Sequence, residues 1–389
     1  MTPDADLLYL LWMTEVAAIA PQKGVRLLEA FGSAKAVWEA STDRIASVVK
    51  LEDSERKRLE NRSLAKPNLI LARCKLQNIA LLPIYDEAYP QRLRNIYDPP
   101  LILYVRGKLP DFNRLPAVAV VGQRKATPYG TIVTERLAFQ LSCSGVIVVS
   151  GMAAGIDSAA HNGAVKGDTP TVAVFGTAID QCYPASNAGL LRAILHSGAA
   201  VSEYPPGKKT NAGAFPRRNR IISGLCLGVV VGEAPAKSGS LITAGLALDQ
   251  GRDVFAVPGA VDAPASEGCN ELIARGAKLV RNARDVLEEY VGLYPFKTAE
   301  EQEEIPEKSV AVKPETPTLK TVYEAPSEPR KPAGETPADP VLAALTDLCS
   351  LEELSRRCGM DTTALLGRLT LLELQGKVRQ LPGQVYEKV

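Results

Sequence analysis

The chain has 389 residues, more than one ordinary domain needs, and 46% of them are hydrophobic while 23% are charged. This balance excludes a wholly disordered chain, and a membrane span is excluded because no stretch reaches the roughly eighteen consecutive apolar residues it requires. The net charge is only +1, so any binding of nucleic acid must depend on a local concentration of basic residues.

Residues 1–78 are predicted to form a small helical domain. Apolar positions recur at helical spacing as far as about Lys75. The glycine at Gly24 and the segment 31–33 resemble the turns of helix-hairpin-helix or SAM-like modules. Such modules bind either the nucleic-acid backbone or another protein, and the short, degenerate signal favours a structural or protein-binding role.

Residues 79–292 are predicted to form a doubly wound α/β domain. Segment 79–106 is expected to be an extended lead-in at the edge of the sheet. Short apolar strands then alternate with helices, at 117–121, 146–150, 171–175, 199–202, 227–231 and 253–257. This alternation predicts an extended Rossmann-like, mostly parallel sheet, whose ligands sit beyond the C-terminal strand ends.

Turns rich in small residues follow several of these strands. Gly122 and Arg124 follow the first strand, and Gly151 and Gly155 follow the second. A further turn precedes the helix predicted at 241–250 and consists of Lys237, Ser238, Gly239 and Ser240. Because a helix start offers unpaired N–H groups and the positive end of the helix dipole, these turns are candidate phosphate sites.

A basic cluster lies between the fourth and fifth strands of this series. Arg217, Arg218 and Arg220 surround Asn219, and Lys208 and Lys209 precede them. We expect these cations, with Arg124 and Lys237, on loops at one rim of the sheet, with one arginine paired to Glu203 or Glu233. The nearby aromatic residues are Tyr129, Tyr204 and Phe215. A basic groove with aromatic side chains is typical of proteins that bind single-stranded DNA, although Phe215 also fits a core position at the start of a helix.

The last hundred residues change in composition twice. Residues 293–339 are rich in Pro, Glu, Lys and Thr, which predicts a disordered linker. Residues 340–389 predict three helices, one of them starting near segment 361–363, and a hairpin around Pro382 and Gly383, as in a winged-helix domain. Its mixed charge leaves binding to duplex DNA and binding to protein equally open.

Cysteine and histidine, which often serve as catalytic residues or metal ligands, show no pattern of either kind here. The seven cysteines form no C-x-x-C pair, which predicts reduced thiols in a cytoplasmic protein and no metal site. Of the two histidines, His161 is expected to be a satisfied helix residue beside Asp157. We therefore expect no cofactor and no catalytic residue.

Together these segments resemble the DNA-processing protein A (DprA/Smf) family. The resemblance covers roughly residues 80–290 and depends on motifs that occur in the family's order. They are Gly122-x-Arg124, Ser150-Gly151-x-Ala153-x-Gly155-Ile156-Asp157 with His161, Tyr183-Pro184, Ser202-Glu203-Tyr204-Pro205, Phe215-Pro216-x-Arg218-Asn219-Arg220, Glu233-Ala234 with Lys237-Ser238-Gly239-Ser240, and Val257-Pro258-Gly259. Gln123 and Ala178 depart from the residues that the family usually has at those positions.

The resemblance implies a function as well as a fold. It implies a protein, usually a dimer, that binds single-stranded DNA and helps to load the RecA recombinase onto it during natural transformation. The DNA would contact the fifteen candidate residues Gly122, Arg124, Gly151, Gly155, Lys208, Lys209, Phe215, Arg217, Arg218, Asn219, Arg220, Lys237, Ser238, Gly239 and Ser240.

Two enzymatic or cofactor-binding alternatives use a similar scaffold. A phosphoribohydrolase of the LOG or lysine-decarboxylase-like type would use Glu233 or Asp157 as acid or base, but its PGG-x-GT-x-x-E motif is missing after Pro258. A dinucleotide-binding protein would need Gly-x-Gly-x-x-Gly after a strand and an acidic residue about twenty positions later, and that fingerprint does not occur here.

Overall fold

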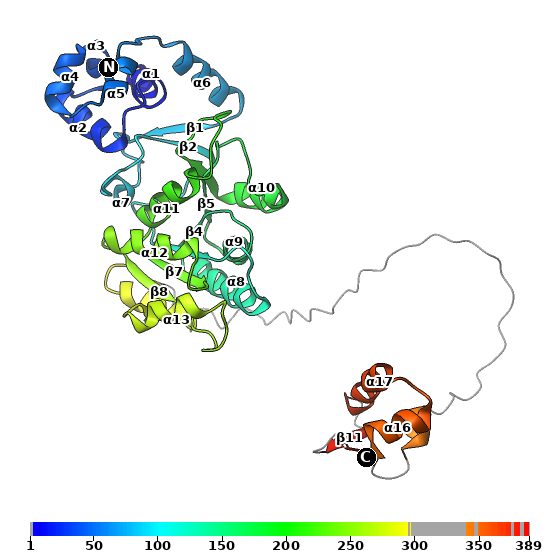
Figure 1. The fold of residues 1–389 in the computed structure, drawn as a ribbon. Coiled ribbons are helices and arrows are strands. Elements are labelled where there is room, and N and C mark those ends of the chain that lie inside the picture. The colour runs from blue at the N-terminus through cyan, green and yellow to red at the C-terminus, as the bar shows by residue number, and fades with distance from the viewer. Residues whose placement is uncertain are drawn as a thin grey trace, which may run out of the picture. The chain divides into compact units, whose positions relative to one another are not determined.

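The computed structural model describes residues 3–294, 296, 340–345, 349–374, 377–381 and 385–388. Its contacts divide the chain into two compact units, residues 1–308 and 309–389, which are described separately (Figure 1). The linker predicted at 293–339 lies almost entirely outside the described residues.

Six helices begin the first unit, as the helical spacing predicted. They are α1 (Pro3–Glu15), α2 (Pro21–Phe31), α3 (Ala34–Glu39), α4 (Thr42–Val48), α5 (Asp53–Leu59) and α6 (Ala65–Leu76). Ser33 and Ser41 cap α3 and α4, their side chains accepting hydrogen bonds from the N–H groups of Ala36 and Arg44. Trp12 is fully buried, and its indole N–H donates to the Asn61 carbonyl at 2.7 Å. Buried side chains of these helices belong to one hydrophobic cluster.

A nine-stranded sheet forms the rest of the first unit. Its strands are β1 (Ala80–Pro83), β2 (Ile102–Gly107), β3 (Ala117–Gly122), β4 (Ile147–Ser150), β5 (Val172–Phe175), β6 (Ala199–Ser202), β7 (Gly228–Glu233), β8 (Asp253–Ala256) and β9 (Lys278–Leu279). The spatial order is β1-β2-β6-β5-β4-β3-β7-β8-β9, with β3 to β9 parallel and β1 and β2 antiparallel at one edge. The predicted Rossmann-like sheet and its lead-in edge are therefore confirmed.

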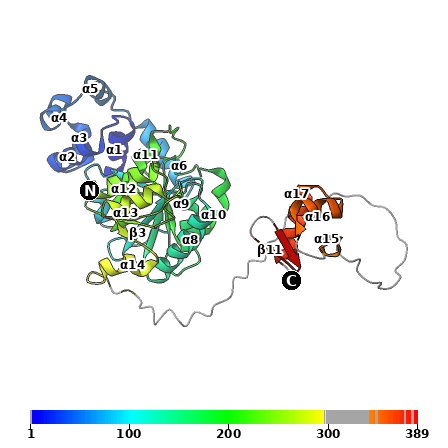
Figure 2. The same ribbon diagram turned by 60° about the horizontal axis from the view of Figure 1, so that its bottom comes forward.

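Helices cover both faces of this sheet. They are α7 (Gln91–Arg94), α8 (Pro128–Cys143), α9 (Ile156–Ala164), α10 (Ala188–Ser197), α11 (Ala214–Leu225), α12 (Gly239–Asp249), α13 (Glu267–Ala274) and α14 (Ala283–Leu287), with 3₁₀ turns η1 (Ala185–Asn187) and η2 (Glu288–Tyr290). Figure 2 shows α11 and α12 on one side of β3 and α8 and α9 on the other. Alternate β3 residues enter the two cores accordingly, Ala119 on the α11 side and Val118 on the α8 side.

The winding direction of the sheet changes at β3. The chain proceeds from β3 outward to β4, β5 and β6, then returns to the other side of β3 with β7 and β8. At such a switch point the connections leave in opposite directions and open a crevice beyond the C-terminal strand ends. The core on the α11 face is continuous with that of helices α1–α6, so Leu11 and Val121 belong to one cluster.

The second unit is a winged-helix domain. It contains α15 (Pro340–Ala344), β10 (Cys349–Ser350), α16 (Leu351–Cys358), α17 (Thr362–Leu374), β11 (Val378–Leu381) and β12 (Val385–Lys388). The three strands form an antiparallel sheet in the order β10-β12-β11, and Leu354, Leu365 and Tyr386 are among its buried core residues. The helix start expected near 361–363 is confirmed, whereas the turn at Pro382 and Gly383 lies outside the described residues.

Three further sequence predictions concern cysteines, metals and membrane spans. All seven cysteines are free thiols. Within the described ranges, no three His, Cys, Asp or Glu side chains are grouped so that they could hold a metal ion. No described helix combines the length and apolar character needed to cross a bilayer.

His161 on α9 predicts how stability depends on pH. Its Nδ1 lies 2.9 Å from Oγ1 of Thr171, which itself donates to the Val148 carbonyl, so Nδ1 carries the proton. Burial lowers the pKa of His161 from 6.5 to about 3. Because only the unfolded chain then binds a proton near neutrality, His161 contributes stability that is complete above pH 6.5 and is lost as the pH falls toward 3.

We expect the free energy of unfolding to fall by about 2 kcal/mol more, between about pH 7 and pH 5, in the parent protein than in a His161→Gln variant. Urea unfolding at both pH values measures this difference. If the free energy of unfolding fell equally in both proteins, His161 would be protonated in the folded state as easily as in the unfolded chain, and burial would not lower its pKa.

Candidate nucleic-acid interface

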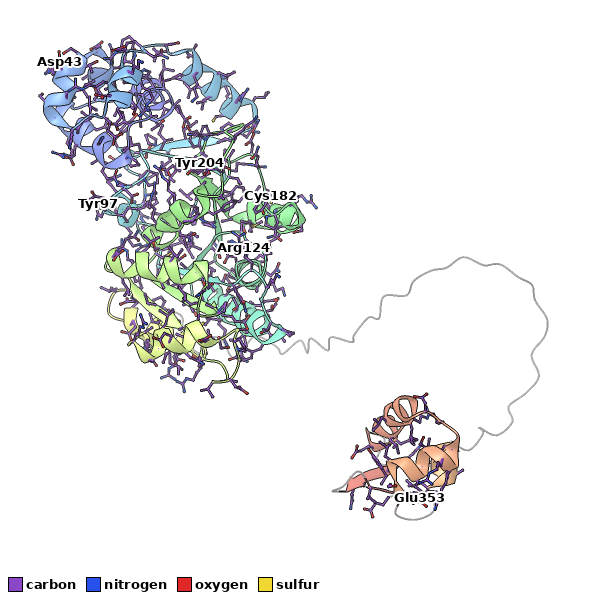
Figure 3. All side chains as sticks on the ribbon, viewed as in Figure 1. Asp43, Tyr97, Arg124, Cys182, Tyr204 and Glu353 are labelled. Atoms are coloured by element: carbon purple, nitrogen blue, oxygen red, sulfur yellow. The ribbon has the colours of Figure 1, made fainter. Side chains whose placement is uncertain are left out.

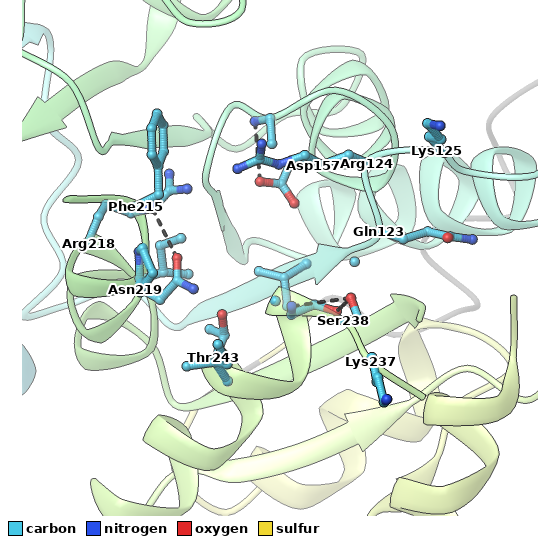
Figure 4. Close-up of a pocket in the computed structure, with 18 of the residues that line it drawn as sticks. Gln123, Arg124, Lys125, Asp157, Phe215, Arg218, Asn219, Lys237, Ser238 and Thr243 are labelled. Carbon is cyan, nitrogen blue, oxygen red and sulfur yellow. Dashed lines mark hydrogen bonds between the residues drawn. The ribbon is translucent and has the colours of Figure 1, made fainter. Parts of the chain in front are cut away.

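A pocket of about 630 Å³ opens at the switch point of the sheet (Figure 4). Three segments supply most of its wall: the loop after β3, the first turns of α11, and the start of α12. In Figure 4, Phe215, Arg218 and Asn219 lie at one end of the pocket, and Gln123, Arg124 and Lys125 extend toward the other. Of the candidate residues predicted from sequence, Gly122, Arg124, Phe215, Arg218, Asn219, Lys237, Ser238, Gly239 and Ser240 line it.

Glu233 fixes the loop after β3. This carboxylate at the end of β7 is 2% exposed and accepts hydrogen bonds from the Gln123 side-chain amide at 2.7 Å and the Thr127 N–H at 2.8 Å. The Thr127 hydroxyl donates to its other oxygen at 2.5 Å. Gln123, which departs from the family pattern, therefore takes part in holding the loop. The same contacts occupy both oxygens of one candidate acid or base of the enzyme alternative.

Three cations lie on the rim of the pocket. Arg124, Lys125 and Lys237 are exposed, and none of them has an ion-pair partner within the part of the chain that the structure describes. The Arg124 guanidinium lies 5.6 Å from the centroid of the Phe215 ring, a cation–π distance. Sequence reasoning missed Lys125, whose only signal was its place directly after Arg124 in the loop that follows β3.

The aromatic residues divide between the pocket and its surroundings. Phe215 is half-buried, and its ring centroid lies 5.4 Å from that of Tyr183, an exposed pocket residue that was not among the candidates. Tyr129 is exposed, but its hydroxyl donates to the Pro258 carbonyl at 2.7 Å. Phe215 and Tyr183 are therefore the aromatic faces that the pocket offers.

Arg218 lies in the floor of the pocket instead of on its rim, and the expectation of a loop position is wrong. It is on α11 and only 6% exposed, and its Nη1 donates to the Gly151 carbonyl at 2.5 Å and also to the Val174 carbonyl. Burial lowers the pKa of Arg218 to about 10, an effect that the Asp157 charge opposes. The guanidinium stays charged at neutral pH and contributes a fixed positive potential beneath the pocket.

Arg220 and Arg217 are engaged with acidic residues. Arg220 is 4% exposed, with Nε 2.8 Å from Asp98 Oδ2 and Nη2 2.6 Å from Glu203 Oε1. Arg217 is half-exposed and its Nε lies 3.5 Å from the other oxygen of Glu203. The predicted pairing with Glu203 is confirmed, whereas the expected rim position is wrong for Arg220, because α11 turns that side chain toward the sheet edge.

Lys208 and Lys209 do not line the pocket. Lys208 Nζ donates to Glu15 of α1 at 2.8 Å, and the Glu15 side chain is only 3% exposed. This lysine therefore joins the loop after β6 to the N-terminal helices. Lys209 is exposed.

The turn with Gly151 and Gly155 does not form the open anion cradle that was expected. Asp157 Oδ2 accepts the N–H groups of Gly151 at 3.1 Å and Ala153 at 3.3 Å, so the chain's own carboxylate occupies them. A Cβ at Gly151 would lie 2.4 Å from the Arg218 guanidinium, and Gly155 has φ of 81° with its Cβ position 2.4 Å from the Gln123 carbonyl oxygen. These glycines allow the close approaches that shape the pocket.

The start of α12 retains the geometry of an anion site. Ser238 caps the helix, its hydroxyl 2.7 Å from that of Ser240 and accepting the Ser240 N–H at 3.4 Å. Lys237, Ser238, Gly239 and Ser240 all line the pocket. The positive end of the α12 dipole, Lys237 and the buried Arg218 thus act on the same space, which favours a ligand carrying negative charge.

Comparisons with known proteins identify the family of the chain. The profile of the family described as DNA recombination-mediator protein A matches residues 80–291, and that of the DprA winged helix domain matches residues 325–384. DNA processing protein DprA of Streptococcus pneumoniae is 44% identical over 56% of this chain and 76% of its own length. Protein Smf of Synechocystis is 32% identical over 99% of both chains.

Two solved structures resemble the chain as well. The crystal structure of DprA from Streptococcus pneumoniae superposes with a TM-score of 0.64 and 36% identity, covering 75% of this chain and 98% of that one. A DprA structure from Helicobacter pylori gives 0.50 and 30% identity, covering 56% and 97%. With the matched family spanning more than half of its length, this chain belongs to the DprA/Smf family.

Proposed function

We propose that the protein binds single-stranded DNA across the C-terminal ends of β3, β4 and β7. The observation that carries this proposal is the pocket at the switch point, with Arg124, Lys125 and Lys237 exposed on its rim and Arg218 buried beneath it. The exposed cations meet phosphates, and Phe215 and Tyr183 meet bases, which is the combination that a single strand requires. Arg220, which is 4% exposed and forms ion pairs with Asp98 and Glu203, takes no part in DNA contact.

The family assignment supports this proposal. DNA processing protein A from Helicobacter pylori has a single-stranded DNA binding mode, and its structure superposes on 56% of this chain. The shared family supports a role in DNA processing. The cations around the pocket support a negatively charged ligand.

A binding function accounts for the carboxylates better than the enzyme alternative does. Glu233 accepts three hydrogen bonds from the loop after β3, and Asp157 holds the loop after β4. Burial raises the pKa of Asp157, while the Arg218 charge and its backbone hydrogen bonds lower it. Both groups have structural partners at the positions where a hydrolase would need a free acid or base. We therefore propose a protein without catalytic residues.

The proposed role in the cell extends from binding to recombination. The protein would act as a homodimer in the cytoplasm, protect incoming DNA and load RecA during natural transformation. The description of the family as a recombination mediator supports this role. A dimer would also lengthen the basic track that a bound strand follows.

Replacing the three rim cations tests the binding site. Binding of a labelled oligo-dT, followed by fluorescence anisotropy from about 50 to about 200 mM salt, should weaken with a log–log slope of about −0.7 per phosphate neutralised. The variant Arg124→Gln/Lys125→Gln/Lys237→Gln should lower the magnitude of this slope by about 2, because three contacts are lost.

The matched control is Arg114→Gln/Arg136→Gln/Arg192→Gln, which removes three exposed cations that do not line the pocket. It should keep the parental slope. Equal slopes for the rim variant and the parent protein would place the DNA elsewhere on the chain.

The RecA step has its own measurement. ATP hydrolysis by RecA on an oligonucleotide precoated with a single-strand-binding protein should begin sooner when this protein is added, and the rim variant should not shorten that delay. An unchanged delay with the parent protein would leave DNA binding intact and contradict RecA loading.

A further inference from the structure

A second, smaller pocket lies between the N-terminal helices and the sheet edge. It encloses about 280 Å³ and is lined by the end of α1, the segment that leads to α2, strand β2, and the loop after β6. Its side chains include Glu15, Tyr104, Glu203, Tyr204, Lys208 and Arg217. In Figure 3, Tyr204 lies on the N-terminal-helix side of Arg124.

Two buried polar atoms of the lining residues lack hydrogen bonds within the described residues. The Tyr104 side chain is 1% exposed, and its hydroxyl has no partner. Oε2 of Glu203 is buried and accepts no hydrogen bond, although Arg217 Nε is 3.5 Å away. Because burial raises the pKa of Tyr104 well above 10, its hydroxyl keeps its proton and remains a donor. A buried donor and a buried acceptor without partners cost free energy unless a ligand or water pairs with them.

The pocket also has an aromatic face and an exposed cation. Tyr204 is partly exposed, with Lys208 Nζ 5.4 Å from its ring centroid. The Arg217 side chain is 49% exposed, and within the described ranges only its Nε lies at ion-pair distance from a carboxylate. A phenol donor, a carboxylate acceptor, an aromatic ring and an outer guanidinium match a nucleotide, since every base has ring or exocyclic N–H donors beside acceptors and carries a phosphate nearby.

The two pockets lie on different sides of the first turn of α11. Phe215, Arg218 and Asn219 line the pocket at the switch point, and Arg217 lines the smaller one. Successive residues of a helix point about 100° apart, and a helix with its side chains is about 10–12 Å across. A DNA strand that leaves the pocket at the switch point and crosses the exposed Pro216 and Arg217 therefore reaches the smaller pocket within a few nucleotides.

We propose that the smaller pocket is a second nucleotide subsite, which takes a base of the strand bound at the switch point while Arg217 holds the adjoining phosphate. This inference depends on the proposed binding of single-stranded DNA. It also gives the N-terminal helices a part in binding, because Glu15 and the segment Ala18–Pro21 form one wall of the subsite.

The test compares oligo-dT of about twelve nucleotides with an abasic strand of the same length, which keeps the phosphates and lacks the bases. Tyr104→Phe removes only the hydroxyl, so it should weaken binding of oligo-dT about fivefold and leave the abasic strand unaffected. Arg217→Gln should weaken both strands and lower the magnitude of the salt slope by about 0.7.

Tyr97→Phe is the matched control, because Tyr97 is 85% exposed and lines neither pocket. The melting temperature of Tyr104→Phe should equal or exceed that of the parent protein, since the lost hydroxyl has no partner in the free protein. Oligo-dT affinity equal to that of the parent would overturn the subsite.

Binding of free thymidine monophosphate shows whether the smaller pocket takes a free nucleotide or a nucleotide of the bound DNA strand. If Tyr104→Phe weakens the mononucleotide and not oligo-dT, the pocket serves a free nucleotide, and the proposed continuity with the strand is overturned. If the rim variant abolishes binding of both strands while Tyr104→Phe has no effect, the main site holds and only the subsite fails. If the rim variant binds both strands as the parent protein does, the proposed binding of DNA at the switch point is itself contradicted.

Discussion

The buried guanidinium of Arg218 is the constraint on which the architecture of the site depends. One side chain on α11 bonds to carbonyls at the ends of β4 and β5, so it joins a helix to two parallel strands at their C-terminal ends. Asp157, also buried, contributes opposite charge and folds the turn between β4 and α9. The buried charge of Arg218 is tolerated because its Nε and Nη1 donate hydrogen bonds and the Asp157 carboxylate lies nearby. Removing either Arg218 or Asp157 leaves the charge of the other buried without its partner.

Charged residues near the site therefore divide into two groups. Arg218, Arg220, Lys208 and Glu233 have buried or half-buried partners and determine the positions of α11 and the adjoining loops. Arg124, Lys125 and Lys237 remain exposed and able to meet a ligand. This division explains how a chain with a net charge of +1 presents a basic pocket, because the acidic residues around the pocket are already paired.

The sequence predicted the scaffold well and the individual side chains less well. Apolar runs such as 117–121 and 227–231 bury both faces of a strand, so their alternation with helices predicts the parallel sheet and its ligand-binding edge. The burial of Arg218 was not predictable, because its carbonyl partners lie 67 and 44 residues away. Likewise, Lys208 meets Glu15 across 193 residues. Local composition identifies a basic cluster and cannot tell which of its members tertiary contacts will pair.

Photochemical cross-linking tests most directly whether single-stranded DNA occupies the pocket at the switch point. An oligo-dT carrying 5-iodouracil would be irradiated with the protein, and the adducts located by mass spectrometry. We predict adducts on Phe215 or Tyr183, the aromatic faces of that pocket. Adducts confined to residues outside it, such as Tyr97 or Tyr386, would contradict binding at the switch point.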